Sequence, residues 1–326
     1  MADNFSGKGR TFRDLQESVK QTVELQAQTA GGITQLMSQM SRFDGYGLTN
    51  AAAINMQDSK AQAVATLSQW RNLGYQVKDL KHSIKVWMPV QKTYFLRGGK
   101  RTDVRDATAA ERADITSGTI SAERITAYRA GFGYDIAQTN CPRQEYAHVI
   151  GETNYSHLET EQKYDCLRSA AESCGFEVTE DANVYGANYH ENVITVSSQL
   201  HPAEKLAALC GAFSQGIVDQ SSSQPQDIRR FDSQALAFFL QTRLGVPENL
   251  RDLPEPSACQ AVKSMQRLES SLVRTQRMLT FSENGLNEEL QERGLDIAPA
   301  QEQTAKKEQL TEQQKQANRN FMQDIV

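Results

Sequence analysis

Residues 194–218, ITVSSQLHPAEKLAALCGAFSQGIV, decide the fold class of this chain. The stretch opens with β-branched and apolar residues typical of a strand, and a helical pattern begins at Pro202. Along that pattern the apolar residues recur every three or four positions, at Leu206, Leu209, Phe213 and Ile217. A second helix is predicted over 232–244, with Leu236, Phe239, Leu240 and Leu244 on its apolar face. A strand followed by two packed helices indicates an α+β module.

The sequence before this stretch predicts further elements of both kinds. Short strands are predicted over 176–178, 184–189 and 193–196, and a helix over 161–174. Near the N-terminus, a helix is predicted over 11–30 that begins at Thr11 and ends at Gly31 and Gly32. A second helix is predicted over 33–42. Two more are predicted over 50–56, with Thr49 as the N-cap residue, and over 59–73. Apolar and aromatic runs within 75–96 and over 131–136 predict a small sheet. Between these runs, a short helix in an insertion or linker is predicted over 107–113.

These patterns divide the chain into four regions. We expect a helical N-terminal extension (1–42), a small mixed α/β module (43–142), an α+β module (143–254) and a helical, partly disordered tail (255–326). In the tail, apolar residues over 258–281 recur near every 3.5 positions, which suits pairing with another helix and makes an oligomer conceivable. Beyond Gly294 large apolar residues are scarce, which favours disorder or a solvated helix.

Composition excludes several classes of protein. With 39% hydrophobic and 23% charged side chains in 326 residues, a wholly disordered chain is excluded. No apolar run approaches the roughly 20 residues of a membrane-spanning helix, and the polar start lacks a signal-peptide core. We therefore expect a cytoplasmic protein without membrane contact. The five cysteines have no CxxC spacing and are interpreted as free, mostly packed thiols: Cys141, Cys166, Cys174, Cys210 and Cys259.

Charge is distributed unevenly along the chain. The net charge is −5 overall, but +5 over 61–142 and −8 over 143–254. A basic segment followed by an acidic one predicts two modules with different partners, or two modules that attract each other.

The basic segment combines cations with aromatic rings. Between Arg71 and Arg105 there are nine basic and two acidic residues. Single-strand binding without sequence preference needs cations that follow the phosphates and rings that stack on bases. The candidate DNA-binding residues are Trp70, Tyr75, Lys78, Lys81, Lys85, Trp87, Lys92, Tyr94, Arg97, Lys100 and Arg101. Alternation predicts Lys85 and Trp87 on one face of a strand, opposite Ile84, Val86 and Met88. The alternative is that Trp70 and Trp87 are core residues and the lysines a solvated face.

Three stretches together resemble the ArdC antirestriction family of plasmids and phages, which joins a single-stranded-DNA-binding module to a zincin-like metallopeptidase module. The first is FDGYGLTNAAAINMQDSKAQAVATLSQWRNLGYQV (43–77), with matching positions Tyr46, Asn50, Trp70, Gly74 and Val77. The second is GFGYDIAQTNCP (131–142), with Gln138 and Thr139. The third is 194–218 together with FDSQALAFFLQTRLGV (231–246). The resemblance implies that 43–142 is the DNA-binding module and 143–254 the zincin-like module.

The zincin-like module departs from the pattern that the resemblance implies. There the first helix carries HExxH, two zinc-ligating histidines and a glutamate that activates water. The matching positions here are Gly211, Ala212 and Gln215, which offer neither a histidine ligand nor a base. The resemblance therefore implies a degenerate metallopeptidase without catalytic residues, resident metal or cofactor.

Two alternatives bear on chemistry. His190, His201 and Asp232 would form an unusual metal site if they converged, and otherwise the two histidines lie exposed on loops. Cys210 lies beside the lost motif and is interpreted as a packed thiol, because a nucleophilic cysteine would need a base in hydrogen-bond reach.

Three functions compete. The first is a non-catalytic accessory protein of a phage or plasmid, antirestriction-like, that binds single-stranded DNA through the basic aromatic segment. The second is a protein-binding inhibitor or assembly component that acts on a host defence or phage protein through the acidic module and the C-terminal helices. The third, ranked last, is a hydrolase with an unusual metal set.

Overall fold

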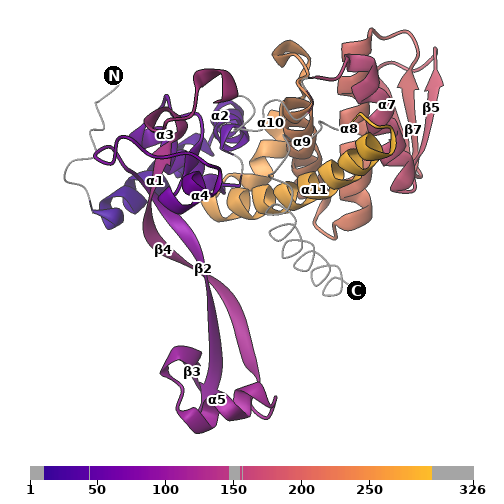
Figure 1. Cartoon of the computed structure of the whole chain (residues 1–326). Coiled ribbons are helices and arrows are strands. Elements are labelled where there is room, and N and C mark those ends of the chain that lie inside the picture. The colour runs from indigo at the N-terminus through magenta and orange to yellow at the C-terminus, as the bar shows by residue number, and fades with distance from the viewer. Residues whose placement is uncertain (1–10, 44, 147–154, 156, 296–326) are drawn as a thin grey trace.

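The chain has an α+β fold, as the residue patterns predict (Figure 1). The computed structural model describes residues 11–43, 45–146, 155 and 157–295. The N-terminal part contains α1 (Phe12–Gln26), α2 (Ala30–Arg42), α3 (Leu48–Gln57), β1 (Val64–Ala65), α4 (Leu67–Asn72), β2 (Ile84–Arg97), β3 (Lys100–Asp103), α5 (Ala109–Thr116) and β4 (Ala122–Asp135). The C-terminal part contains α7 (Thr160–Ser173), β5 (Glu177–Asp181), β6 (Ala187–His190), β7 (Val193–Ser197), α8 (Pro202–Ser221), α9 (Gln226–Arg243), α10 (Pro256–Cys259) and α11 (Met265–Glu292).

The first two helices start where their capping residues lie. Thr11 caps α1, as predicted, but α1 ends at Gln26 and the prediction that Gly31 and Gly32 terminate it was wrong. Both glycines lie in the first turn of α2, because the Thr29 side chain accepts a hydrogen bond from the Gly32 backbone N–H at 3.0 Å. A Cβ at position 32 would lie 2.1 Å from the Gln26 carbonyl oxygen, so only glycine permits this close turn.

The next two predicted helices also change. Helix α3 begins at Leu48 with Gly47 as its N-cap residue, in place of Thr49. The single helix predicted over 59–73 is a short strand, β1, followed by the six-residue α4. Thr66 and Gln69 form a reciprocal capping box that starts α4 at Leu67, while β1 pairs with the end of β4.

Strands β2 and β4 form a long antiparallel ribbon that projects from the helical body (Figure 1). Residues 84–135 are called the arm, and the connecting residues 98–121 at its far end are called the tip. Pairing runs from Ile84 opposite Gly133 to Phe95 opposite Ala122. The separate runs predicted within 75–96 and over 131–136 therefore belong to two strands of 14 residues each. The short helix predicted over 107–113 is present as α5 and lies in the tip of the arm.

The second sheet has the strand order β5-β7-β6. Strand β5 is parallel to β7, and β6 is antiparallel to β7. Val178, Ile194 and Val196 are buried and belong to the main core, together with the apolar faces of α7 and α8. The predicted strands over 176–178, 184–189 and 193–196 are all present with shifted ends.

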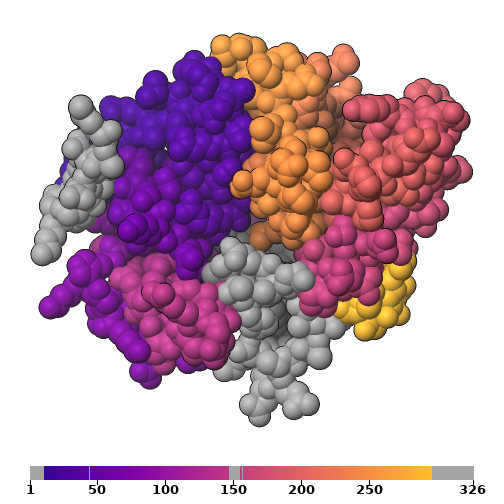
Figure 2. Space-filling view, turned by 90° about the horizontal axis from the view of Figure 1, so that it is seen from above, coloured from indigo at the N-terminus to yellow at the C-terminus, as the bar shows by residue number. Residues whose placement is uncertain are grey.

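The main core is continuous between the two parts of the chain. One cluster of buried apolar residues extends from Leu15 in α1 to Leu290 in α11. Figure 2 shows the N-terminal helices, in indigo, directly against the later helices, in orange. The apolar stripe of α11, which includes Leu268, Leu272 and Leu279, is buried against the chain's own α7 and α9. The apolar residues of 258–281, which suit pairing with another helix, therefore pack against helices of the same chain. The predicted disorder beyond Gly294 falls almost entirely on residues 296–326, outside the described residues.

Candidate functional site

The arm has a root, residues 84–88 with 129–135, and a shaft, residues 89–93 with 124–128. The root is held by two side-chain amides of α3. Asn50 donates through Nδ2 to the Trp87 carbonyl at 2.8 Å, and its Oδ1 accepts from the Trp87 N–H at 2.8 Å. Gln57 makes the same pair of bonds with the Lys85 backbone, at 2.8 and 2.9 Å. The two amides replace a neighbouring strand along this edge of β2. The backbone groups of Lys85 and Trp87 therefore point away from β4.

One face of the arm carries aromatic rings. By the register of the ribbon, Trp87 on β2 shares this face with Tyr128 and Phe132 on β4. At the root, Phe12 of α1 packs edge-on against both Trp87 and Phe132, with ring centroids 6.3 and 5.8 Å away. Further out, Tyr128 is 67% exposed, and Phe132 remains 49% exposed. We call this surface the aromatic face.

Two of the predicted DNA-binding rings, Trp70 and Tyr75, lie away from the aromatic face, in or against a small buried cluster. Trp70 is 1% exposed, and its Nε1 donates to the Tyr134 carbonyl at 2.8 Å, so it is a core residue and cannot stack on a base. Tyr75 packs edge-on against Trp70, and its hydroxyl donates to Glu145 Oε2 at 2.8 Å. Burial and this carboxylate raise the pKa of Tyr75 far above its ordinary value. The core alternative was correct for Trp70.

The predicted cations divide between the root, the shaft and the tip of the arm. Lys78 and Lys81 are exposed in the loop that leads into β2, and Lys85 is half-buried at the root. Lys92 and Tyr94 lie on the face opposite the aromatic face, and Lys100 is exposed at the turn between β2 and β3.

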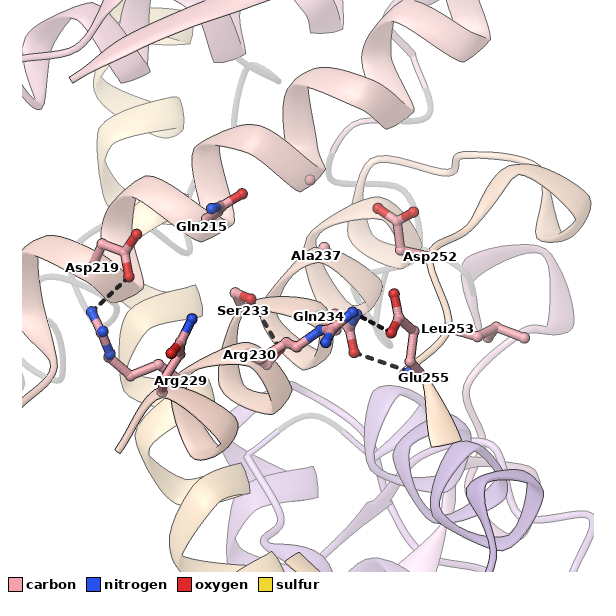
Figure 3. Close-up of a pocket in the computed structure, with 12 residues that line it drawn as sticks. Gln215, Asp219, Arg229, Arg230, Ser233, Gln234, Ala237, Asp252, Leu253 and Glu255 are labelled. Atoms are coloured by element: carbon pink, nitrogen blue, oxygen red, sulfur yellow. Dashed lines mark hydrogen bonds and ion pairs between the residues drawn. The ribbon is translucent and has the colours of Figure 1, made fainter. Parts of the chain in front are cut away.

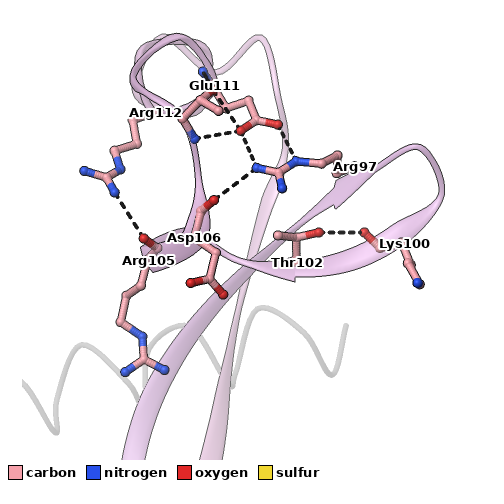
Figure 4. A network of polar contacts seen from close by, with 8 residues as sticks. Arg97, Lys100, Thr102, Arg105, Asp106, Glu111 and Arg112 are labelled. Atoms are coloured by element: carbon pink, nitrogen blue, oxygen red, sulfur yellow. Dashed lines mark hydrogen bonds and ion pairs between the residues drawn. The ribbon is translucent and has the colours of Figure 1, made fainter.

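Two predicted arginines are held in ion pairs. Arg101 pairs with Glu123 at 2.6 Å and lies over the Tyr94 ring. Arg97 bonds both oxygens of Glu111, at 2.7 and 2.6 Å, and Glu111 also accepts from Thr108 at the start of α5 (Figure 4). The pKa of Glu111 falls to about 2, chiefly because of the Arg97 hydrogen bond. Arg97 and Glu111 thus join the end of β2 to α5 and stabilise the tip.

Four arm residues on β4 are absent from the set predicted from the sequence. Arg124 and Arg129 are exposed, and neither forms an ion pair within the described residues. Tyr128 and Phe132 supply the most exposed rings of the aromatic face. The available signal was the alternation over 122–135, AERITAYRAGFGYD, which continues the strand predicted only from Gly131.

A polar pocket of about 570 Å³ lies between α8, α9 and the segment 252–255 (Figure 3). Its lining consists of Gly211, Gln215, Asp219, Gln226, Arg229, Arg230, Ser233, Gln234, Ala237, Asp252, Leu253 and Glu255. Arg229 pairs with Asp219 at 2.9 Å, and Arg230 pairs with Glu255. The pocket therefore holds three carboxylates and two guanidinium groups, and both guanidinium groups are already paired.

The pocket includes positions that the resemblance assigns to zinc ligands, and their residues do not fit that metal. Gly211 has no side chain, Ala212 is buried and apolar, and Gln215 offers an amide in place of an imidazole. A Cβ at position 211 would lie 3.0 Å from Asp252 Oδ2, so the Asp252 carboxylate stands beside the first ligand position. Across the part of the chain that the structure describes, no group of three or more His, Cys, Asp and Glu side chains could hold a metal ion.

Asp252 itself is held by Gln241. The Gln241 Nε2 donates to Asp252 Oδ2 at 2.7 Å, and the Asp252 N–H donates to Gln241 Oε1 at 2.7 Å. Although the residue as a whole is exposed, its carboxylate lies against α8 and α9, and this burial raises its pKa.

The alternative metal ligands do not converge. The His190 side chain is 82% exposed at the end of β6, and His201 is the exposed N-cap residue of α8. Asp232 is buried on α9 and pairs with Arg274 of α11 at 3.0 Å. Burial raises the pKa of Asp232 and of the fully buried Cys210 thiol. The described geometry thus agrees with exposed histidines and a packed thiol.

Comparison with known proteins identifies the N-terminal part. Residues 11–125, from α1 into β4, match the family model described as the N-terminal domain of anti-restriction factor ArdC. The N-terminal part of the chain is therefore similar to the N-terminal domain of ArdC anti-restriction factors. The match includes α1 and α2 as well as most of the arm.

The whole chain was also compared with solved structures and curated proteins. The metal-free crystal structure of the antirestriction ArdC protein from the R388 plasmid aligns with a TM-score of 0.49 and 13% identity, over 78% of this chain and 96% of that one. Its Mn(II)-bound structure aligns with a TM-score of 0.42 and 12% identity, over 78% and 95%. No curated protein matches the chain.

None of the described helices has the length and apolar character needed to cross a bilayer.

Proposed function

We propose that the arm binds single-stranded DNA and that the protein acts as a non-catalytic, antirestriction-like accessory factor of a phage or plasmid. The observation that carries this proposal is the combination of exposed rings and cations on one projecting ribbon. Tyr128 and Phe132 are exposed, and Lys100, Arg124 and Arg129 form no recorded ion pair within the described residues. Rings of this kind stack on unpaired bases, while cations follow the phosphates.

The proposal revises the set of DNA-binding residues. Trp70 leaves the set because it is buried, and Arg97 and Arg101 have structural partners. Trp87, Lys85, Lys92, Tyr94 and Lys100 remain, with Lys78 and Lys81 beside the root. The residues added from β4 are Arg124, Tyr128, Arg129 and Phe132. Base stacking is assigned to the aromatic face, and phosphate contact to the cations of both faces, including Lys92 and Arg129 on the face opposite the rings.

A fluorescence-anisotropy titration with a labelled single-stranded oligonucleotide tests this proposal. The double variant Lys92→Glu/Arg129→Glu should bind more weakly, and the salt dependence of its affinity should fall by about 0.7 per lost phosphate contact. Arg267→Glu, which changes an exposed cation on α11, is the matched control and should bind normally. Absence of binding by the unmodified protein at low salt, or normal binding by the double variant, would refute the proposal.

The C-terminal part is proposed to have no peptidase activity. Support comes from Gly211, Ala212 and Gln215, and from the Asp252 carboxylate beside position 211. Metal analysis of protein purified without chelator and a peptide-cleavage assay test this part. Stoichiometric zinc with cleavage that depends on it would overturn it.

A second candidate function is protein binding by the acidic part of the chain. Residues 143–254 have a net charge of −8, and their pocket holds more carboxylates than guanidinium groups. A basic surface on a host defence or phage protein would complement this charge. Co-purification from cells that carry such a target, with Asp219→Lys/Glu255→Lys as the comparison, tests this function; equal recovery of the target would exclude it.

A further inference from the structure

The shaft of the arm has only two strands. Between the body and the tip, Pro89–Thr93 of β2 pair with Arg124–Tyr128 of β4, and β3 joins only beyond Thr93. A two-stranded ribbon alone is marginally stable in water, and further strands stabilise it. Each edge of such a ribbon presents backbone groups that can pair with another strand.

The edge of β2 is largely covered. Gln57 and Asn50 bond the outward backbone groups of Lys85 and Trp87, and β3 pairs with residues 94–97. Between these contacts the outward residues are Pro89, which has no N–H to donate, Gln91 and Thr93. The open stretch on this edge is therefore short and begins with a proline.

The edge of β4 is open over a longer stretch. Strand β1 pairs only with Tyr134 and Asp135. Because Lys85 and Trp87 point away from β4, alternation directs the backbone groups of residues 124, 126, 128, 130 and 132 away from β2. Within the described chain no other backbone group pairs with them, and no proline interrupts the stretch. Nine residues of extended chain span about 30 Å.

The residues along this edge are self-complementary. In an antiparallel pair centred on Tyr128, the two Tyr128 residues would be opposite each other, Arg124 opposite Phe132, and Thr126 opposite Ala130. All five side chains lie on the aromatic face, as the register places them. The pair would bring a guanidinium over an aromatic ring at both ends and two tyrosine rings together at the centre. A two-fold axis between the two Tyr128 residues generates the Arg124–Phe132 and Thr126–Ala130 contacts twice each.

We propose that two copies of this chain associate through the β4 edges of their arms and form a four-stranded sheet. This pairing satisfies the outward backbone groups of residues 124–132 and places two aromatic faces side by side. It shares Arg124, Tyr128 and Phe132 with the proposed DNA-binding surface, but it rests on the open backbone edge of β4 and not on DNA binding. The arm, residues 84–135, has nine basic and six acidic residues, so two arms repel each other at low salt. Salt should therefore strengthen the dimer, whereas it weakens DNA binding.

Light scattering coupled to size-exclusion chromatography, on the full chain at several concentrations and salt levels, tests the proposal. We expect a mass approaching twice 36.4 kDa with rising salt and concentration. Thr126→Pro removes an outward N–H and no backbone bond to β2, so it should return the mass to 36.4 kDa. It also removes the exposed side-chain bond that Gln91 Nε2 donates to Thr126 Oγ1. Hydrogen exchange of the β2 amides should show that the arm of this variant is intact. Ala127→Pro, which removes an N–H that points toward β2, should raise that exchange.

A cross-linking experiment tests the register. Tyr128→Cys should join two copies through a short bismaleimide linker, because the two positions face each other, whereas Ala113→Cys at the tip should not. Four of the five native thiols are buried and the fifth is half-buried. A monomer under every condition, a Thr126→Pro variant with the mass of the unmodified protein, or equal cross-linking at 113 and 128 would each overturn the proposal.

Discussion

The indole Nε1 of Trp70 donates a hydrogen bond to the carbonyl oxygen of Tyr134 at 2.8 Å, and both residues are buried. This bond joins α4 to the root of β4, beside a small cluster that also contains Ile136 and Cys141. An aromatic residue in a basic stretch thus contributes to the rigidity of the arm and not to its binding surface.

Trp70→Phe should reduce stability and leave oligonucleotide affinity unchanged. Loss of the indole donor leaves the Tyr134 carbonyl without this bond, at a cost of about 1–3 kcal/mol in the free energy of unfolding. Urea denaturation measures this change. Tyr128→Ala is the converse control, since it should weaken binding by about 1–3 kcal/mol with little change in stability. Reduced affinity in Trp70→Phe at unchanged stability would contradict both assignments.

Asn50→Ala should loosen the root of the arm. The substitution removes both bonds to the Trp87 backbone, and we expect the free energy of unfolding to fall by about 1–3 kcal/mol. Asn50→Asp keeps an acceptor for the Trp87 N–H but loses the donor to its carbonyl, so an intermediate effect is expected. Equal unfolding midpoints for the three proteins would show that the amide does not support β2.

Glu111→Ala should open the tip without affecting the root. Glu111 accepts hydrogen bonds from both Arg97 and Thr108, which hold β2 and α5 together. Hydrogen exchange should accelerate in α5 and β3 and remain unchanged in α3. Glu123→Ala removes the exposed partner of Arg101 and serves as the comparison, with a small expected effect because exposed pairs contribute little. Unchanged exchange in α5 would show that Glu111 is dispensable.

Asp252→Asn should stabilise the protein at neutral pH. Burial raises the pKa of Asp252 above the ordinary 3.8, so the folded state binds its proton more tightly than the unfolded state does. The carboxylate therefore reduces stability above its folded pKa, and the penalty disappears as the pH falls below 3.8. The gain from Asp252→Asn should disappear over the same range, which thermal unfolding at several pH values measures.

Asp103→Asn provides a control of opposite sign. The Arg105 hydrogen bond lowers the pKa of Asp103 to about 2, so this carboxylate stabilises the protein above pH 3.8 and loses its effect as the pH falls toward 2. The substitution should destabilise at neutral pH. Identical pH profiles for the two variants would contradict the assigned directions.

Local patterns predicted much of the helical structure. Capping at Thr11, the apolar stripes of α8 and α9 and the strand that precedes α8 depend on neighbours within a few positions, and they agree with the structure. Two predictions failed because a capping threonine lies inside the predicted helix. Thr29, within the helix predicted over 11–30, is the N-cap residue of α2, so Gly31 and Gly32 belong to α2. Thr66, within the helix predicted over 59–73, is the N-cap residue of α4.

The arm could not be predicted as a unit. In each strand, side chains of different character alternate in a way typical of a strand. The pairing of the two strands, however, places Ile84 opposite Gly133, with 48 residues between them in the chain, and a local residue pattern cannot predict that contact. For the same reason Tyr128 and Phe132 were missed, since their place on one face with Trp87 follows from the register.

The α+β class, the uneven charge and the absence of HExxH follow from the amino-acid sequence, because they depend on residue identity and short-range periodicity. Which aromatic residues are buried, which arginines are paired, and the position of Asp252 beside Gly211 follow from the folded arrangement of the chain. Burial and ion pairing arise between residues distant in the chain, so they are properties of the folded molecule and not of any one segment.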